Sequence, residues 1–485
     1  MATMNKTKVR EEVERVKQEF EQLCLADKVA PEMRALMNSM LLIVELILSV
    51  FLEKKTRKNS KNSSIPSSQT GKDETAKSDP KSKGKGKKVG GEISNTRIKE
   101  IVTIAKAETC DVCGTLLDQT PCQGLERRTK IDIVFEKVVE HIDAEIKECP
   151  NCKATAKGDF PKDMPGSLQY GNGLKAFAIH LIISQMVALN RVQKQISAMI
   201  GTVISEATLL KFIWRLHQSL EEWETKSIES ILQAPSIHVD ETSFRVEGKN
   251  HWIHVYSSGG ITLKLLHRKR GKDAIVDVGI IPRYGGVIIH DCWASYLSYD
   301  HCGHGLCGSH LLRELTFIID SNRYRWATNI KRLLQETCHI VSKREDKCLT
   351  DKEYANLQKR YRNILTRGGK ELPEIPPRPK GKRGRLAKSD AHNLWERLKK
   401  NETAVLLFAK KSYVPFTNNR AERDLRMAKV KQKVSGCFRR KKYAHAYCRI
   451  SSYLQTMASQ GVNPLVAIQM ALADKTTDAD FNRGE

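Results

Sequence analysis

The middle of the chain reads Ser236-Ile-His-Val-Asp240, then His251-Trp-Ile-His-Val-Tyr256, then Ile261-Thr-Leu-Lys-Leu-Leu266. Apolar side chains recur at every second position in these segments, which is the period of a β-strand. Turn-forming residues separate the segments, at 248–250 and again at 257–260. The pattern predicts three consecutive strands that pair as an antiparallel meander.

A fourth strand is predicted at Gly286-Val-Ile-Ile-His-Asp291, after a short helix at 274–278. The crossover between the third and fourth strands lets the first and fourth lie side by side. Asp240 and Asp291, which end these two strands, then meet at one edge of the sheet. The chain that follows is mainly helical. We therefore expect an α/β domain over residues 231–475, with a mixed sheet, flanking helices and a helical insertion.

A third acid lies in Phe416-Thr-Asn-Asn-Arg-Ala-Glu-Arg-Asp-Leu-Arg426. Asn418 or Asn419 can cap a helix here, and Glu422 then falls in the first turn of that helix. The cations on the same stripe of the helix are Arg426, Lys429 and Lys433. One acid that leads a row of cations suits a site that holds a metal ion against phosphate.

Asp240, Asp291 and Glu422 together offer hard oxygen ligands, which bind Mg²⁺ or Mn²⁺. Two such ions about 4 Å apart can stabilise the attacking and leaving oxygens of phosphoryl transfer. The alternative is structural, because aspartates at strand ends often cap the turn that follows. Glu241 is left outside this set, since it would point to the opposite face of the strand.

Four cysteines form two Cys-x-x-Cys pairs, Cys110-Asp-Val-Cys113 and Cys149-Pro-Asn-Cys152. This spacing lets four thiolates close a tetrahedral Zn²⁺ site, so residues 96–165 are expected to form a small zinc-ribbon-like module. Residues 130–139 look like a strand that would bring the two pairs together, and Cys122 is a spare ligand. The zinc would be structural, and its simplest role is to staple a small domain.

Charge and cysteine content limit the classes of partner and compartment. Lys and Arg number 82 against 56 Asp and Glu, a formal charge of +26 that favours nucleic acid as the partner. The thirteen cysteines follow no secretory signal, so we expect a reducing compartment. The longest apolar run, Met40 to Leu52, contains Glu45 and is shorter than the roughly 20 residues of a bilayer span, so no membrane association is expected.

The first half of the chain divides into helical and flexible parts. Residues 1–52 carry apolar positions three and four apart, which predicts either an oligomerising coiled coil or an intramolecular helical hairpin. Residues 53–95 are rich in Lys, Ser and Gly and predict a flexible basic linker. In residues 166–230, a helix that ends at Gly201 precedes a capped helix at 204–209, which predicts either a DNA-binding helix-turn-helix or an ordinary helical hairpin.

Three segments resemble the catalytic blocks of insertion-sequence family sixty-six transposases: Val239-Asp-Glu-Thr-Ser-Phe244, His290-Asp-Cys-Trp-Ala-Ser-Tyr296 and Asn418-Asn-Arg-Ala-Glu-Arg-Asp-Leu-Arg426. The serine-rich residues 59–68 and the cysteine module also lie where that family has such segments. Its members are DDE enzymes with a ribonuclease-H-like core. The resemblance therefore implies this fold for residues 231–475 and makes Asp240, Asp291 and Glu422 the DDE triad.

The resemblance also implies a reaction and its partners. The enzyme would cleave the terminal inverted repeats of its own element and join them to target DNA, using two Mg²⁺ or Mn²⁺ ions. It would act in the prokaryotic cytoplasm, at the nucleoid, as a homodimer or larger assembly, with or without accessory proteins encoded in the same element. Arg383 and Arg385 lie in a basic insertion around residues 340–400. The cations expected to contact DNA are Arg383, Arg385, Arg420, Arg426, Lys429, Lys433 and Arg439.

A further signature, Cys307-Gly-Ser-His310, resembles the Cys-x-x-His that related DDE families carry between their second and third acids. We expect a structural role for Cys307 and His310, because such a pair packs or hydrogen-bonds as readily as it binds a metal. A metal site is the alternative, with His301, Cys302 and His304 nearby as further ligands.

Two other functions compete with the transposase. The first is a zinc-containing DNA-binding protein without catalysis, and the second is a nuclease of the same fold that hydrolyses DNA without joining it. Asp240→Asn would abolish cleavage in an enzyme and leave DNA binding intact, whereas a silent binder has no cleavage to lose. Joined DNA products would separate the transposase from the nuclease.

Overall fold

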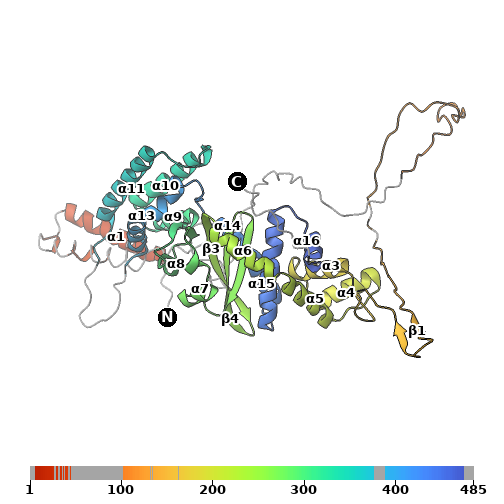
Figure 1. The fold of residues 1–485 in the computed structure, drawn as a ribbon. Helices are drawn as coiled ribbons and strands as arrows, with labels where there is room; N and C mark the ends of the chain where they lie inside the picture. Colours follow the sequence, from red (N-terminus) through yellow and green to blue (C-terminus); the bar gives the residue numbers. More distant parts are fainter. Residues whose placement is uncertain are drawn as a thin grey trace. The chain divides into compact units, whose positions relative to one another are not determined.

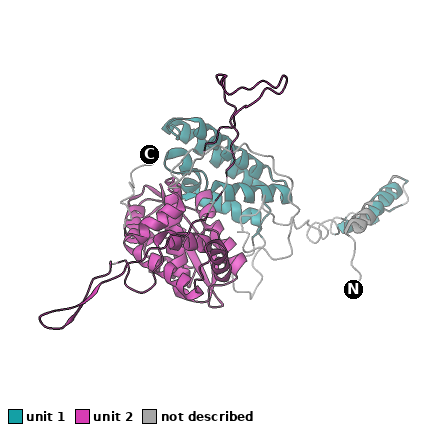
Figure 2. Cartoon of the chain, turned by 90° about the vertical axis from the view of Figure 1, so that its right-hand side faces the viewer, with its two compact units in different colours: residues 1–78, 305–417 teal, residues 79–304, 418–485 magenta. Residues whose placement is uncertain are grey.

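The computed structural model describes residues 6–26, 102–375 and 388–474, except 132, 134 and 162, together with 29, 30, 33, 34, 37, 39–41 and 44. The chain divides into two compact units, which Figure 2 shows in different colours. Unit 1 comprises residues 1–78 and 305–417, and unit 2 comprises residues 79–304 and 418–485. All three of the predicted catalytic acids therefore belong to unit 2.

The main sheet has five strands (Figure 1). They are, in chain order, β3 (Ser236–Val246), β4 (Lys249–Ser258), β5 (Ile261–His267), β6 (Val287–His290) and β7 (Gly303–Leu306). Their order in the sheet is β5-β4-β3-β6-β7, in which β4 pairs antiparallel with β3 and β5, and β6 pairs parallel with β3. The predicted meander and the position of the fourth strand beside the first are confirmed.

Helices that come before and after the sheet in the sequence pack against it. Unit 2 contains α3 (Asn172–Ile183), α4 (Leu189–Ile200), α5 (Glu206–Ser219), α6 (Glu221–Gln233), α7 (Lys272–Val278), η1 (Ile281–Arg283), α8 (Ala294–Leu297), α14 (Asn419–Ser435), α15 (Lys441–Ser459) and α16 (Pro464–Leu472). The helix α14 contacts β3 and β4, and α15 lies along β5. The predicted α/β fold with flanking helices is therefore confirmed.

One apolar core joins the sheet to these helices. It contains Ile237 and Val239 of β3, Val255 of β4, Leu425 of α14 and Tyr453 of α15, all at most 1 % exposed. The alternation that predicts the strands is thus the alternation that fills the core. Residues almost two hundred positions apart in the sequence share one packed frame as a result.

The predicted helix, glycine turn and capped helix are present at α4 and α5. Gly201 ends α4 with a φ of 62°, a left-handed conformation that favours glycine. The Ser205 hydroxyl then accepts a hydrogen bond from the Thr208 N–H at 3.1 Å and caps α5. A helix-turn-helix that binds DNA stays a prediction, because a helical hairpin would have the same local features.

The described elements of unit 1 are helices. They are α1 (Lys6–Leu25), α9 (Gly308–Asn322), α10 (Arg325–Lys343), α11 (Asp351–Glu371), α12 (Asp390–Lys400) and α13 (Glu402–Lys410). The predicted helical insertion between the second and third acids is therefore confirmed. The predicted linker at 53–95 and most of the second N-terminal helix lie outside the described residues. None of the helices within the described residues is both long and apolar enough to cross a lipid bilayer.

Candidate active site and cysteine knuckles

Asp240 on β3 and Asp291, the residue directly after β6, occupy matching positions on neighbouring chain segments. The parallel pairing ends where His238 faces Ile289, so each aspartate lies two residues beyond the last pair. Residues in register on neighbouring parallel strands, about 4.8 Å apart, point to the same face of the sheet. The prediction that Asp240 ends its strand is wrong, because pairing with β4 continues β3 as far as Val246.

The start of α14 is fixed to β3 by one side chain. The Asn418 Nδ2 donates to the Val239 carbonyl at 2.7 Å, and the Asn418 Oδ1 lies 2.9 Å from the His238 Nδ1, which therefore donates to it. Glu422 lies in the first turn of this helix. The third acid is thus carried on a helix whose start is bonded to the residue before Asp240.

Asp240 shows the strongest electrostatic effect of the three acids. Burial raises the pKa of Asp240 well above its usual range, and the negative charges of Glu241, Asp291 and Glu422 raise that pKa further. The Glu241 N–H, which donates to the Asp240 Oδ1 at 2.8 Å, opposes the rise. Because charge interactions fall off with distance, the carboxylates that raise the pKa of Asp240 lie within interaction range of it.

Asp291 also has the structural role that the alternative interpretation predicts. The Trp293 N–H donates to the Asp291 Oδ1 at 3.1 Å, so this aspartate caps the turn after β6. A carboxylate has two oxygens with several acceptor positions, and one capping bond leaves it able to bind a cation. The two roles are therefore compatible.

Glu241 is buried and held by two partners. The Arg270 Nε donates to the Glu241 Oε1 at 2.7 Å, and the Tyr296 hydroxyl donates to the Glu241 Oε2, also at 2.7 Å. The Arg270 guanidinium lies 4.5 Å from the centre of the Trp293 ring. Burial and the charge of Asp291 raise the pKa of Glu241, while Arg270 and Tyr296 lower it. Glu241 thus connects the sheet to the turn after Asp291.

A buried polar cluster, which the sequence analysis missed, ties α14 to the sheet. Asp424 is 3 % exposed and accepts hydrogen bonds from the Ser257 Oγ at 2.7 Å, the Thr262 Oγ1 at 3.0 Å and the Gln455 Nε2 at 2.8 Å. The Lys264 Nζ donates to the Gln455 Oε1 at 2.5 Å. Burial lowers the pKa of Lys264 to about 8, against the opposing charge of Asp424. This cluster fixes the helix that carries the third acid.

The cations predicted to contact DNA have different surroundings. Those at least partly exposed to solvent are Arg426, Lys429, Lys433 and Arg439. Arg420 turns inward, because its Nη2 donates to the Ile261 carbonyl at 3.0 Å and its Nε lies 4.0 Å from an Asp424 carboxylate oxygen. Arg383 and Arg385 lie outside the described residues. Arg420 therefore has a contact inside the protein, whereas Arg426, Lys429 and Lys433, further along α14, are at least partly exposed.

Each Cys-x-x-Cys pair forms a tight turn of the same kind, which we call a knuckle. The Cys110 carbonyl accepts from the Gly114 N–H at 2.8 Å, and the Cys149 carbonyl accepts from the Lys153 N–H at 2.9 Å. Gly114 and Lys153 have positive φ angles of 73° and 60°. The second knuckle joins the short strands β1 (Ile146–Glu148) and β2 (Thr155–Lys157).

Hydrogen bonds inside each knuckle favour the thiolate form of one cysteine. Thr115 and then Cys110 lower the pKa of Cys113, and the N–H groups around Cys152 lower the pKa of Cys149. The thiolate is the form that binds Zn²⁺. Among the described residues, no three of the four sulfurs lie within 4.8 Å of one another, so each knuckle holds its own pair of thiols.

The strand predicted at 130–139 is wrong, since the described residues of this segment form no strand. Its alternating side chains, such as Ile131 at 89 % and Val138 at 86 %, are exposed. A strand needs a paired neighbour and a surface on which to bury one face, and alternation alone supplies neither. Cys122, the spare ligand, donates from its Sγ to the Gly124 carbonyl at 3.3 Å.

The family model described as Transposase IS66 family matches residues 167–446, which is more than half of the chain. The chain belongs to the IS66 family of transposases. The resemblance noted in the sequence is thereby confirmed. No curated protein matches the chain. The matched range contains Asp240, Asp291 and Glu422 and begins after both knuckles. As a transposase, this protein binds DNA and is a DNA-cleaving enzyme.

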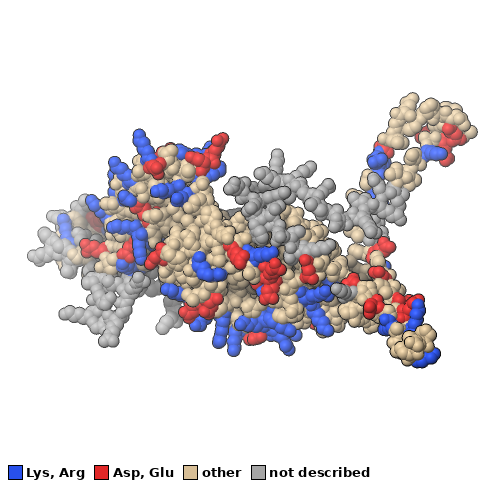
Figure 3. Space-filling model, viewed as in Figure 1, with Lys and Arg blue, Asp and Glu red and all other residues tan. Residues whose placement is uncertain are grey.

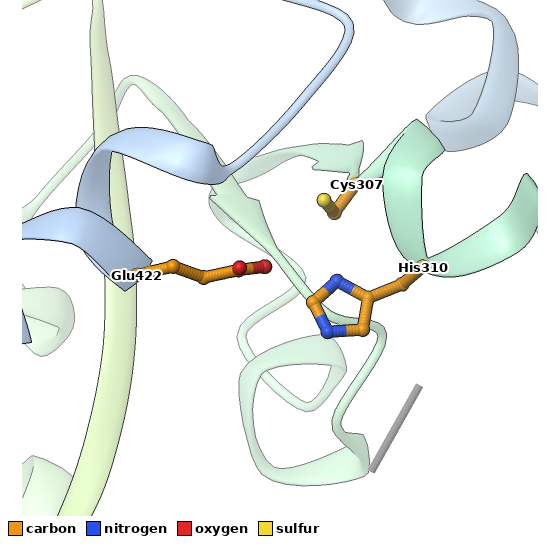
Figure 4. A group of neighbouring side chains, drawn as sticks. All are labelled: Cys307, His310 and Glu422. Carbon is orange, nitrogen blue, oxygen red and sulfur yellow. The ribbon is translucent and has the colours of Figure 1, made fainter. Parts of the chain in front are cut away.

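The IS66 transposase carries its Cys-x-x-His signature at the start of α9. Cys307 is the residue before the helix, His310 lies in its first turn, and both side chains are buried with ligand atoms within 4.8 Å of each other. Figure 4 draws these two side chains together with that of Glu422. Between them, a Cβ added at Gly308 would lie 2.3 Å from the Phe416 ring, so only glycine fits there. The structural role of the Cys307 and His310 pair stays a prediction, with a metal site as its alternative.

The other potential metal ligands near this signature of the IS66 transposase make polar contacts with other groups of the protein. The Cys302 Sγ donates to the Tyr284 carbonyl at 3.0 Å, and His301 lies 3.2 Å from a backbone carbonyl. The His304 Nδ1 lies 3.2 Å from the His290 Nε2. These three side chains form no cluster of metal ligands within the described part of the chain.

Proposed function

We propose that this IS66 transposase cleaves and joins DNA by the DDE mechanism, with Asp240, Asp291 and Glu422 as its triad. We further propose that the sheet is ribonuclease-H-like. The strand order supports this fold, because a three-stranded meander is extended beyond its first strand by a parallel fourth strand and then a fifth. The insertion of unit 1 helices between the second and third acids is compatible with that core.

The observation that carries the proposal is the electrostatic coupling of Asp240 to the other two acids. Asp291 and Glu422 both raise the pKa of Asp240, although they are 51 and 182 positions further along the chain. Acids collected for structural reasons are usually paired with cations, as Glu241 is with Arg270. Repulsion among carboxylates on one face of a sheet is what a bound cation relieves.

The donor set fits Mg²⁺ or Mn²⁺, because carboxylate oxygens are the ligands that these hard cations prefer. Asp240, Asp291 and Glu422 would hold the ions. When bound, two such ions would activate a water or a DNA 3′-hydroxyl and stabilise the leaving oxygen. The protein's own part is positioning: Asn418 and the Asp424 cluster hold α14 against the sheet, and Arg270 holds Glu241 away from the ligands.

The cations of α14 would hold the DNA strand beside the triad. Arg426, Lys429 and Lys433 follow Glu422 on one stripe of the helix, where they neutralise phosphates of the bound strand. Two element ends have to be cut together, so we propose a homodimer or larger assembly, with or without accessory proteins of the same element. Arg420 is better explained by its contact with the Ile261 carbonyl.

We also propose that Cys110, Cys113, Cys149 and Cys152 bind one structural Zn²⁺. The matching turns of the two knuckles and the lowered thiol pKa values support this proposal. The ion would link the two knuckles to each other. It would thereby hold together a module in which the protein chain alone forms only local turns.

The test of the triad is Asp240→Asn, assayed on DNA that carries the inverted repeats flanking the gene, with Mg²⁺ or Mn²⁺. We expect strand cleavage and joining to fall by at least about 10³-fold, because an amide is a poor ligand for these ions. Asp300→Asn removes an exposed acid of the same type and is the matched control. A variant that cleaves within a fewfold of the wild type contradicts the triad.

The two rival functions give different outcomes in the same experiment. Wild-type protein that binds the labelled ends without metal-dependent cleavage would identify a silent DNA-binding protein. Cleavage without joined products would identify a nuclease. The transposase requires all three results: binding, cleavage and joined product.

A further inference from the structure

A second group of cations lies away from the α14 stripe, where the β3–β4 hairpin meets the loop before α15. Figure 3 shows Lys and Arg gathered below β4 and the start of α15. We call this group the hairpin cation surface. Its members, all exposed, are Arg245, Lys249, Arg439, Arg440, Lys441 and Lys442.

The backbone holds these cations on one rigid frame. The Phe438 N–H donates to the Arg245 carbonyl at 3.0 Å, and the Glu247 N–H donates to the Phe438 carbonyl at 2.8 Å. The loop before α15 therefore pairs with the tip of the hairpin like a short extra strand. The Phe438 ring packs 5.4 Å from the Phe244 ring, centre to centre, which anchors the loop to the core. Because the backbone that carries these cations is already fixed, little backbone conformational entropy is lost when they bind a partner.

Contacts within the protein account for only part of this charge: the Lys442 Nζ lies over the Trp214 ring, and the Arg245 Nη2 donates to the Gly248 carbonyl at 2.8 Å. Residues 439–442 are four cations in succession at the start of α15, where the helix dipole disfavours positive charge. Within the described part of the chain, none of the six cations forms an ion pair with an acid, whereas Lys226 and Lys269 elsewhere in unit 2 do. The one acid beside them, Glu247, accepts from the Lys441 backbone N–H at 3.0 Å. An unpaired cationic surface implies a polyanionic partner.

The surface continues onto α5. The Lys442 Nζ lies 5.3 Å from the centre of the Trp214 ring, and Lys211 lies one helical turn before Trp214 on the same face. The centre of the His217 ring lies 4.9 Å from that of Trp214. Because Lys442 and His217 both lie against the indole, less of its area is left on which to stack an unpaired base. Contact with the phosphates of a duplex suits this surface better.

We propose that the hairpin cation surface binds the phosphate backbone of duplex DNA at a site separate from the α14 stripe. The inference rests on the proposed function, since a transposase has to hold DNA on both sides of the bond that it cuts. It adds a second contact surface, made by the hairpin, the loop before α15 and α5, that the catalytic residues do not share.

The test compares two triple variants of the full chain without divalent ions, so that no DNA is cut. The first is Lys249→Gln, Arg440→Gln and Lys442→Gln, with one substitution on the hairpin, one in the residue before α15 and one in the first turn of α15. The control is Lys226→Gln, Lys272→Gln and Arg283→Gln, which removes the same charge from exposed positions of unit 2. The probe is a fluorescent duplex of mixed sequence, about 30 base pairs long, titrated at several salt concentrations.

We expect the salt dependence of binding to weaken only in the surface variant. Each lost phosphate contact lowers the slope of log K against log salt by about 0.9, so three contacts lower it by about 2.7. Affinity at low salt should fall by at least about tenfold, while thermal unfolding of both variants stays like that of the wild type. A slope equal to that of the control would overturn the inference.

Failure of this inference is distinguishable from failure of the proposed function. If the wild type cleaves element ends but the surface variant keeps its salt slope, the triad stands and the surface does not. If the slope falls but no protein cleaves DNA with Mn²⁺, the surface stands and the catalytic proposal does not.

Discussion

The sheet with α14 and the two cysteine knuckles differ in what holds their chemical groups in place. In the sheet region, Asp424 accepts hydrogen bonds from residues that precede it by more than 160 positions, and these partners are buried. In the knuckle region, the turn bonds join residues four positions apart. Apolar side chains there, such as Val112 at 96 % and Leu116 at 70 %, are exposed.

The difference separates two ways of building a metal site. Protein packing sets the positions of the carboxylates of the sheet region, even though their mutual repulsion opposes it. Each knuckle is a formed half-site, and a shared ion would have to supply the energy that unites the two. Loss of metal should therefore unfold the knuckle region and leave the sheet region folded.

The largest expected effect is the loss of zinc from the knuckles. Cys149→Ser should remove the single Zn²⁺, whose binding is worth on the order of 10 kcal/mol in structural sites. Metal analysis should give about one Zn²⁺ per wild-type chain and none in the variant. Limited proteolysis should then cut within residues 102–165 and spare the sheet.

Cys122→Ser is the matched control, because Cys122 is a cysteine of the same segment whose Sγ donates to the Gly124 carbonyl. It should keep the ion and its protection from protease. Zinc retained by Cys149→Ser, or lost equally from both variants, would contradict the four-cysteine site.

The next effect tests the claim that protein packing alone positions α14. Asp424→Ala leaves two buried donors and the half-buried Gln455 amide without their acceptor, and leaves Lys264 without its nearby negative charge. The free energy of unfolding should fall by about 3–5 kcal/mol, as when one partner of a buried polar pair is removed. Chemical denaturation measures the change. Asp277→Ala, which removes an exposed acid 3.1 Å from His267, should cost less than about 1 kcal/mol.

Lys264 gives the same region a pH dependence. Burial lowers its pKa from 10.5 in the unfolded chain to about 8 in the folded protein. Between these values the unfolded state binds more protons, so stability rises with pH. Relative to Lys264→Met, the wild type should gain about 3 kcal/mol of unfolding free energy from pH 8 to 10.5. Denaturation curves of both proteins across this range measure the gain, and a constant difference between them would show that Lys264 does not titrate there.

Sequence patterns predict the sheet region well because its strands are rich in apolar residues, partly in alternation, and its turns carry glycine, asparagine or serine. The parallel pairing of β3 with β6 follows from the length of the crossover between them. The Asp424 cluster could not be assembled in advance, since its members meet only after the helices have packed on the sheet. A signal existed nevertheless: Ser257, Thr262 and Lys264 interrupt strands that are otherwise apolar.

The errors of prediction have the same physical origin. Residues 130–139 alternate like a strand, but no neighbour pairs with them in the described structure. The first strand is predicted to end at Asp240, yet β4 continues to pair with β3 up to Val246. A local sequence pattern shows which secondary structure a segment prefers. Whether the segment adopts that structure depends on a pairing or packing partner elsewhere in the chain.

The smallest expected effect joins stability to catalysis at Asp240. Its raised pKa means that the folded state binds more protons than the unfolded state above the ordinary value of 3.8, so its ionisation destabilises the fold as pH rises. Asp240→Asn should therefore abolish cleavage and yet make the protein more stable near neutral pH, so that it unfolds at a higher temperature. At pH values below 3.8 the advantage should disappear, because the wild-type carboxyl is then protonated in both states.

Mn²⁺ should raise the unfolding temperature of the wild type and of Asp300→Asn much more than that of Asp240→Asn, since only an intact triad binds the ion tightly. Calorimetry with and without Mn²⁺ measures all three proteins, and an Asp240→Asn variant that unfolds below the wild type at neutral pH would mean that the acid is structural.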